Sequence, residues 1–277
     1  MRLKLIGMLF PLLFLVALVP SAQHPIQHAL LIGVSEYKNP TIHSLSSSKD
    51  ISKLKEALST WGFEDVRIAT SPEQTSQAGI KRALESLLKS CKPNEVVYIH
   101  FSGHGTRVPD QPELAAHADR LEHCICPYDT DFLSGGAVNP RSVILGSDMG
   151  VWLQKFREAG IKNLTLSFDC CHSAGNTRSI GAVARELPNP AADSVSQSND
   201  SREEQHIGLG NFVALYAARA SQKAYEEPDR SGGRFSSALA EAIQFEAHSS
   251  MSYSMLLQRV NSYLHEHGVG EIGRAHV

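Results

Sequence analysis

The sequence lacks the features that mark several large classes of protein. Its 277 residues carry a formal net charge of only −3, and lysine and arginine are scattered along the chain. Without a concentrated basic region it has no electrostatic signature of a nucleic-acid binder, so we expect no nucleic-acid partner. No apolar run reaches the roughly 20 residues that a helix needs to cross a membrane. The chain that follows the N-terminal segment has the length of a single α/β domain.

The longest apolar run lies at the N-terminus. It extends from Leu5 to Val19, directly after the basic residues Arg2 and Lys4. A basic start, an apolar core of about 15 residues and a small-residue exit are typical of a secretory signal peptide. We therefore expect residues 1–22 to be removed and the protein to be exported to the periplasm or beyond, with no stable membrane association afterwards. The alternative, a membrane anchor, would need a longer apolar run.

The C-terminus suggests a second boundary. The last seven residues, 271–277, resemble the translation of a sequencing adapter rather than natural protein. We therefore expect the folded domain to span residues 23–270.

Cysteine is scarce and odd in number, with residues at 91, 124, 126, 170 and 171. If an exported protein pairs some of these five, at least one thiol stays free. Cys170 and Cys171 cannot easily bridge each other, because neighbouring side chains diverge along a strand.

Apolar periodicity predicts alternating strands and helices. Two stretches without a sustained period, 105–147 and 175–210, are expected to be loops, and the polar second one is expected to be mobile. The alternation predicts right-handed crossovers and a mostly parallel central sheet with helices on both faces, a three-layer α/β/α sandwich. The predicted strands are 28–34, 66–69, 95–101, 163–168 and 212–218, and the predicted helices are 50–61, 75–90, 149–159, 235–245 and 252–265.

Two of these strands run directly into reactive residues. One is followed by Ser102-Gly-His-Gly-Thr106 and the other by Asp169-Cys-Cys-His-Ser173. Because the ligand crevice of a parallel sheet lies beyond the carboxyl ends of its strands, His104 and Cys171 can meet there. A thiol and an imidazole held together suffice for acyl transfer, since the imidazole takes the thiol proton and later protonates the leaving amine.

The residues around this pair agree with such chemistry. Gly103 and Gly105 have no side chains, so a peptide backbone could approach His104 closely. The backbone N–H groups of Gly105 and Cys171 are candidates for an oxyanion hole. Taken singly, a cysteine in a strand is more often a small buried hydrophobe. The occurrence of both residues at strand ends favours catalysis.

These two motifs resemble the catalytic boxes of metacaspases and of their bacterial relatives, the orthocaspases, in the caspase-like peptidase clan. The resemblance covers about residues 28–246 and includes His28-Ala-Leu-Leu-Ile-Gly33, Cys126-Pro-Tyr-Asp129, Tyr216-Ala-Ala-Arg219, Gln222, Tyr225-Glu226 and Gly232-Gly-Arg-Phe235. It implies a caspase-like fold and a cysteine endopeptidase with Cys171 as nucleophile and His104 as acid–base partner. It also implies that Cys170 is a small buried residue. His172 would point to the opposite side from Cys171 in an extended chain, so we expect it to have no direct part in proton transfer.

The resemblance further implies a preference for basic substrates. Asp169 and Asp50 match acids that line the family's specificity pocket, and Ser102 matches a further pocket residue. Paired carboxylates in a partly dry cleft select arginine or lysine and repel aspartate. Asp50 could instead be the N-cap of its own helix. The expected partners are proteins or peptides with basic residues, and we expect a monomer.

Two expectations concern cofactors and processing. Many metacaspases need calcium, but their paired acids align here with Gly146 and Ser147, which leaves only Asp148. Another acid aligns with Arg178, so the oxygen ligands that calcium needs are missing and we expect no cofactor. The 175–210 loop lies where caspase relatives are often nicked, and three of its arginines suit self-cleavage by an arginine-specific enzyme: Arg178, Arg185 and Arg202.

Two other readings of the sequence stay open. A caspase-like scaffold could bind peptides without cleaving them. A metal-binding protein could use the soft ligands Cys124, Cys126, Cys170, Cys171 and His172. Zinc sites usually space their cysteines as Cys-x2–4-Cys, which this sequence does not do.

Overall fold

The computed structural model describes residues 25–109, 121–171, 183–193, 212–217, 223–245, 252–267 and 275–276. The expected signal peptide, residues 1–22, lies outside these ranges, as does His172. None of the helices within them combines the length and the apolar character that a membrane span requires.

The centre of the molecule is a six-stranded sheet in the order β2-β1-β3-β7-β8-β9. The first five strands are parallel, and only β9 runs antiparallel to its neighbour β8. Central strands such as β1 are almost continuously apolar because both of their faces are buried. The mostly parallel sheet predicted from the alternation is confirmed. The strand bounds are β1 Gln27–Gly33, β2 Asp65–Ala69, β3 Val96–Ser102, β7 Asn163–Asp169, β8 Val213–Tyr216 and β9 Ala275–His276.

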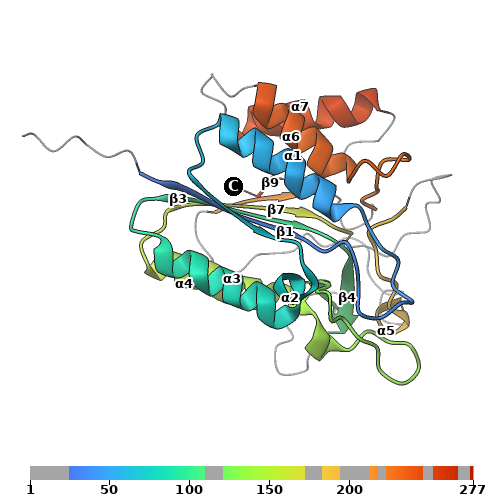
Figure 1. The fold of residues 1–277 in the computed structure, drawn as a ribbon. Helices are drawn as coiled ribbons and strands as arrows, with labels where there is room; N and C mark the ends of the chain where they lie inside the picture. The colour runs from blue at the N-terminus through green and yellow to red at the C-terminus, as the bar shows by residue number, and fades with distance from the viewer. Residues whose placement is uncertain are drawn as a thin grey trace, which may run out of the picture.

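Helices cover both faces of this sheet, as Figure 1 shows. On one face lie α1 (Ser47–Thr60), α6 (Arg234–Phe245) and α7 (Tyr253–Glu266). On the other lie α3 (Gln77–Ser90) and α4 (Gly146–Glu158). Each helix turns an apolar stripe to the sheet, so the sheet separates two apolar clusters. This is the predicted three-layer sandwich.

The prediction of a single helix over 75–90 was wrong in one respect. A short helix, α2 (Pro72–Thr75), is separated from α3 by Ser76, whose backbone is extended. The Ser76 hydroxyl accepts a hydrogen bond from the Gly79 N–H at 3.1 Å and so caps the start of α3.

The prediction that residues 105–147 form a loop was wrong in part, because this stretch also contains strands. It contains β4 (Gly105–Pro109), β5 (Leu121–Ile125) and β6 (Ile144–Leu145), which form a second, antiparallel sheet. Strands of two to five residues are too short to show a clear alternating period, which is why the sequence pattern missed them.

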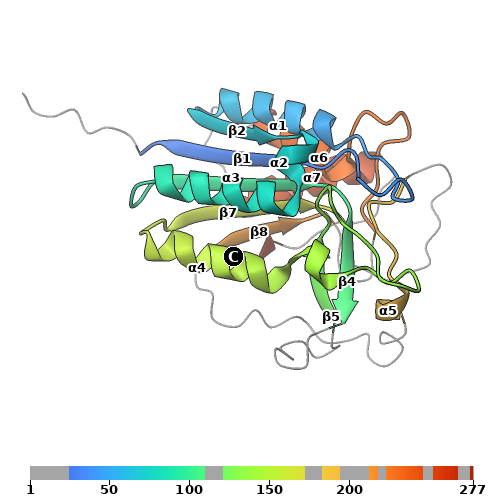
Figure 2. The ribbon, with the colours of Figure 1, turned by 60° about the horizontal axis from the view of Figure 1, so that its bottom comes forward.

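The carboxyl ends of three central strands lie in register. Gly33 of β1 is paired with Ser102 of β3, and Ser102 with Asp169 of β7. Both sequence motifs therefore begin at one edge of the sheet. In Figure 2 this edge faces β4, β5 and the short helix α5 (Pro190–Asp193).

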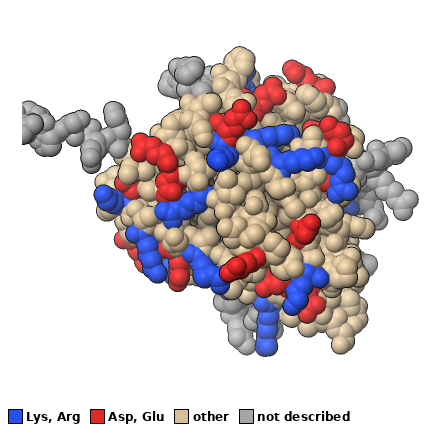
Figure 3. Space-filling view, viewed as in Figure 1, with Lys and Arg blue, Asp and Glu red and all other residues tan. Residues whose placement is uncertain are grey.

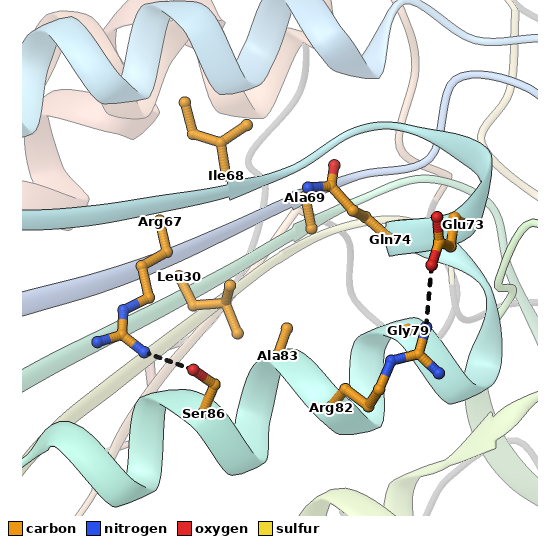
Figure 4. Close-up of a pocket in the computed structure, with 10 residues that line it drawn as sticks. All are labelled: Leu30, Arg67, Ile68, Ala69, Glu73, Gln74, Gly79, Arg82, Ala83 and Ser86. Carbon is orange, nitrogen blue, oxygen red and sulfur yellow. Dashed lines mark hydrogen bonds and ion pairs between the residues drawn. The ribbon is translucent and has the colours of Figure 1, made fainter.

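One surface pocket of the described residues lies away from this edge of the sheet. A pocket of about 430 Å³ lies between β2 and α3, where Arg67 contacts Ser86 at 3.2 Å and Arg82 lies 4.0 Å from Glu73 (Figure 4). None of its lining residues belongs to either motif. On the face shown in Figure 3, acidic and basic side chains are interspersed.

Candidate active site

The two predicted reactive residues lie together beyond the sheet edge. His104 follows β3 and is 2% exposed, and Cys171 follows β7 and is 0% exposed. Gly105 packs so closely on the second motif that a Cβ there would collide with the carbonyl oxygen of Cys171. A residue with a side chain at this position would therefore push the two motifs apart.

The ring of His104 is held by the backbone and by a tyrosine. Its Nε2 lies 2.9 Å from the carbonyl oxygen of His43, so Nε2 carries the proton and Nδ1 holds the free lone pair. Nδ1 is buried and has no hydrogen-bond partner. The His104 N–H donates to the Tyr37 hydroxyl at 2.8 Å, and the two rings are in contact. Burial lowers the pKa of His104 to about 4, against the opposing effect of the His43 carbonyl, so the ring is neutral at pH 7.

The thiol of Cys171 is buried against the backbone of Ala224. Its Sγ accepts the Ala224 N–H at 3.0 Å and donates to the Ala224 carbonyl at 3.3 Å. Burial, and after it the nearby Glu186 carboxylate, raises the pKa of Cys171 to about 12. A neighbouring imidazolium would lower the pKa of a thiol. In this arrangement His104 is neutral, so that lowering is absent.

A segment of the 175–210 loop crosses the two motifs in an extended conformation. The Arg185 carbonyl accepts hydrogen bonds from the N–H groups of Gly105 and Cys171, each at 3.1 Å. These are the two amides expected to form an oxyanion hole. The Arg185 N–H donates to the Ala224 carbonyl at 3.0 Å, and the Leu187 N–H to the Gly105 carbonyl at 2.9 Å.

The side chain of Arg185 is fully buried in an acidic pocket. Its Nη2 lies 2.7 Å from Asp50 Oδ2 and 3.4 Å from Glu226 Oε1. Its Nη1 lies 3.4 Å from Asp169 Oδ2 and also donates to the Ser102 hydroxyl. The structure thus gathers Asp50, Ser102 and Asp169, the three residues predicted to line the pocket, and adds Glu226 to them.

Asp50 is held in this pocket from two sides. Its Oδ1 accepts the Gly233 N–H and its Oδ2 the Ser102 hydroxyl, both at 2.7 Å. Burial raises the pKa of Asp50 to about 6, although the Arg185 guanidinium acts against this. The alternative reading of Asp50 as an N-cap is wrong, because α1 starts earlier, at Ser47, and Asp50 lies inside its first turn.

Asp169 is positioned by a buried polar chain. Its Oδ2 accepts from the Ser236 N–H at 3.0 Å and the Ser236 hydroxyl at 2.6 Å. Behind Ser236 lies His100, whose Nε2 is 3.3 Å from the serine oxygen and whose Nδ1 is 2.7 Å from the Ser167 hydroxyl. Burial lowers the pKa of His100 to about 3, so it is neutral. When the proton of His100 is on Nε2, His100 donates to the Ser236 hydroxyl, and that hydroxyl donates to Asp169.

Gly233 makes room for the guanidinium. A Cβ at this position would lie 2.7 Å from Cζ and 2.8 Å from Nη2 of Arg185, well inside contact distance. The pocket therefore depends on a glycine where the chain enters α6.

The described residues do not fit a calcium site. Gly146 and Ser147 offer no carboxylate, and Asp148 Oδ2 accepts the Leu145 N–H at 3.2 Å at the start of α4. Across the described ranges no three His, Cys, Asp or Glu side chains are arranged to hold a metal ion. All five cysteines are free thiols. Of the other residues in the calcium and metal-site readings, Arg178 and His172 lie outside the described residues.

Comparison with known proteins shows the family to which this fold belongs. The sequence model of the caspase domain family of peptidases matches residues 26–273. The chain belongs to the caspase family. Its caspase domain is 32% identical to metacaspase-7 of Arabidopsis thaliana over 157 residues, which cover 54% of this chain and 35% of that protein. The chain thus spans about a third of the length of that curated relative.

Solved structures share the fold of this caspase domain. Caspase-1 of Spodoptera frugiperda superposes with a TM-score of 0.57 at 12% identity, over 87% of this chain and 77% of that one. Protein GSU0716 of Geobacter sulfurreducens superposes with a TM-score of 0.61 at 14% identity, over 91% of this chain and 92% of that one. The caspase-like α/β/α sandwich expected from the motifs is confirmed.

Several residues of the site were not assigned a role from the sequence. Glu226 lies in a loop without periodicity, and the one sequence signal for it was its place in the Tyr225-Glu226 segment that resembles the family. Ser236 follows the paired glycines at the start of α6, and His100 is an unusual polar residue inside an apolar strand. The Ala224 backbone and the His43 carbonyl give no signal in a sequence, because any residue type supplies these groups.

Proposed function

We propose that this chain is a cysteine endopeptidase that cleaves protein or peptide substrates after arginine, and less readily after lysine. The observation that supports this best is the position of Arg185. Its carbonyl oxygen accepts two amide hydrogen bonds beside Cys171 and His104, while its guanidinium contacts three carboxylates. A substrate arginine bound in the same way would present its carbonyl carbon to the thiol.

In this proposal Cys171 is the nucleophile and His104 the general base. With Nε2–H bound to His43, the free Nδ1 of His104 accepts the thiol proton as sulfur attacks the carbonyl carbon. The amides of Gly105 and Cys171 hold the oxygen as it becomes negative. His104 then protonates the leaving nitrogen, and water hydrolyses the thioester.

The pocket explains the proposed preference. Asp50, Asp169 and Glu226 are all fully buried, so an aspartate side chain would meet uncompensated negative charge. An arginine fork can reach Asp50 and Glu226 with one nitrogen and Asp169 with the other, as Arg185 does. A lysine ammonium is a single point charge and cannot reproduce this spread of contacts. Arginine should therefore be preferred to lysine.

A peptide panel tests the proposal. Matched peptides with Arg, Lys or Asp before the cleavable bond are incubated with the wild-type chain, Cys171→Ala and Cys170→Ala. We expect hydrolysis in the order Arg, Lys, Asp, with activity lost in Cys171→Ala and retained in Cys170→Ala. Binding of arginine peptides without hydrolysis by any form would favour a peptide-binding scaffold instead.

Self-processing within the 175–210 loop forms part of the proposal. An enzyme of this specificity meets arginines in its own loop first, because they are present at the highest effective concentration.

A further inference from the structure

A positively charged side chain lies beside the proposed nucleophile. Lys223 directly precedes Ala224, whose backbone holds the Cys171 thiol through its N–H at 3.0 Å and its carbonyl at 3.3 Å. We propose that the Lys223 ammonium supplies the positive charge that stabilises the thiolate form of Cys171. This inference rests on the proposed function and adds to it a residue that acts on the sulfur through its charge.

The surroundings of the thiol explain why such a charge is needed. The sulfur must lose its proton to attack a carbonyl carbon, and a buried thiolate is costly without a positive charge nearby. Burial keeps His104 neutral until it takes that proton, so the imidazole does not favour the thiolate beforehand. The Arg185 guanidinium is bound to carboxylates in the pocket. In the described part of the chain, Lys223 is a charge that favours the thiolate.

The chain connectivity places the ammonium close to the sulfur. Lys223 Nζ lies 2.8 Å from Glu186 Oε2. Glu186 follows Arg185, whose carbonyl accepts the Cys171 N–H at 3.1 Å. The lysine and the glutamate are therefore each one residue away from a backbone group that contacts Cys171. Their side chains are only 20% and 17% exposed, so salt and water screen their charges less than charges on the open surface.

The pKa shifts of the two side chains agree with this placement. Burial, and after it the Glu186 carboxylate, raises the pKa of Cys171, whereas the Ala224 N–H and the Lys223 ammonium lower it. The hydrogen bond to Glu186 raises the pKa of Lys223, so the lysine stays charged at neutral pH. Glu186 and Lys223 act on the thiol with opposite signs, and their replacement should change its reactivity in opposite directions.

The other ionisable groups around Cys171 have partners or are neutral. The pocket carboxylates, which contact the Arg185 guanidinium at 2.7 to 3.4 Å, are Asp169 from β7, Asp50 from α1 and Glu226 from the chain beyond Ala224. His104, which follows β3, is neutral. Burial raises the pKa of the neighbouring Cys170 thiol well above its usual value, so this thiol is neutral too.

Lys223 gives up no proton in this proposal. The thiol proton goes to His104 Nδ1, and the sulfur carries a negative charge until its bond to the carbonyl carbon forms. Lys223 keeps its own proton and lowers the free energy of that charged state. A bound substrate takes the place of the segment around Glu186, and a neutral substrate residue at that position leaves the ammonium to the thiolate.

The test measures how fast iodoacetamide alkylates Cys171, with the label located by peptide mass spectrometry. This small neutral reagent reacts with the thiolate, so below the thiol pKa its rate reports the thiolate fraction. Between about pH 6 and pH 9, Lys223→Gln should react about 3- to 10-fold more slowly than wild type, which corresponds to a pKa raised by about half to one unit. Glu186→Gln should react faster by a similar factor.

The paired variants separate charge from loosening of the structure. Both break the same ion pair, so loosening alone would change both rates in the same direction. Lys223→Arg keeps the charge and should match wild type. Lys155→Gln removes a cation that lies 4.3 Å from the centre of the Trp152 ring on α4, and it should also match wild type.

Peptide hydrolysis distinguishes failure of this inference from failure of the proposed function. For an arginine peptide with a neutral residue after the cleavable bond, kcat/KM of Lys223→Gln should fall by the same factor as the alkylation rate. Active enzyme in which Lys223→Gln alkylates at the wild-type rate, or in which both variants shift in the same direction, would overturn the role of Lys223 and leave the peptidase standing. Absence of peptide hydrolysis in every form would remove the peptidase and the inference together.

Discussion

Replacement of Glu226 by glutamine tests whether charge in the pocket selects arginine. Glu226 Oε1 lies 3.4 Å from Arg185 Nη2, and the carboxylate also accepts the Ser46 N–H. Glutamine has the same shape and keeps an oxygen for Ser46, so the substitution removes little besides the charge.

The expected magnitude follows from this distance. Two unit charges 3.4 Å apart interact by about 5 kcal/mol at an effective dielectric constant of 20, which is a ceiling. Hydrogen bonds to charged groups contribute a net of about 1.5–3 kcal/mol, because water competes for both partners. With Asp50 and Asp169 still present, kcat/KM for an arginine peptide should fall about 10- to 150-fold.

The assay compares two peptides that differ only in charge. One has arginine before the cleavable bond and the other has citrulline, which has the same shape but is neutral. In Glu226→Gln the ratio of the two kcat/KM values should fall by that factor, while the citrulline value changes little. Arg230→Gln removes the half-exposed partner that lies 3.7 Å from Glu226 and should leave the ratio unchanged. An unchanged ratio in Glu226→Gln would refute the reasoning.

Three further predictions concern positioning, pH and calcium. Ser236→Ala leaves Asp169 without the hydroxyl 2.6 Å away, so steady-state kinetics should show a KM for arginine peptides raised about tenfold with kcat little changed, and Ser237→Ala should behave as wild type. A KM that stays constant would contradict this role of Ser236. Hydrogen bonds from Arg67, then from His28, lower the pKa of Asp65, so the stability they give is present above the unfolded pKa and is lost as the pH falls through the folded pKa. The difference in Tm between wild type and Asp65→Asn should therefore be largest near neutral pH and shrink below about pH 4, and a difference that grows in acid would exclude this account. Hydrolysis rates should agree within about twofold with calcium and with a chelator, because the matching positions lack ligands, and a large stimulation by calcium would contradict the prediction.

The parts of the fold that the sequence predicted are those with strong periodicity. Strands such as β1 and β3 are buried on both faces, and their apolar runs end directly at Gly33 and Ser102. Because parallel strands share a carboxyl edge, the two motifs could be placed together before any coordinates. The short strands β4–β6 and the break at Ser76 depend instead on pairing and on local capping, which periodicity does not report.

Sequence motifs predicted which side chains form the site, but not which loop residue would enter it. Asp50, Ser102 and Asp169 follow from the family pattern, and the structure gathers them around one guanidinium. That the guanidinium belongs to Arg185 depends on how a polar loop folds back over the sheet edge. Three arginines lie in that loop, and no sequence pattern distinguishes one of them from the others.

The central claim, that Cys171 is the nucleophile beside an arginine pocket, is tested most directly by covalent labelling. An arginyl acyloxymethyl ketone should alkylate Arg185→Gln, whose pocket is vacated, and peptide mass spectrometry should find the label on Cys171 alone. His104→Ala in the same background should label far more slowly. A label on Cys170 or another cysteine, or labelling that is equally fast without His104, would contradict the account.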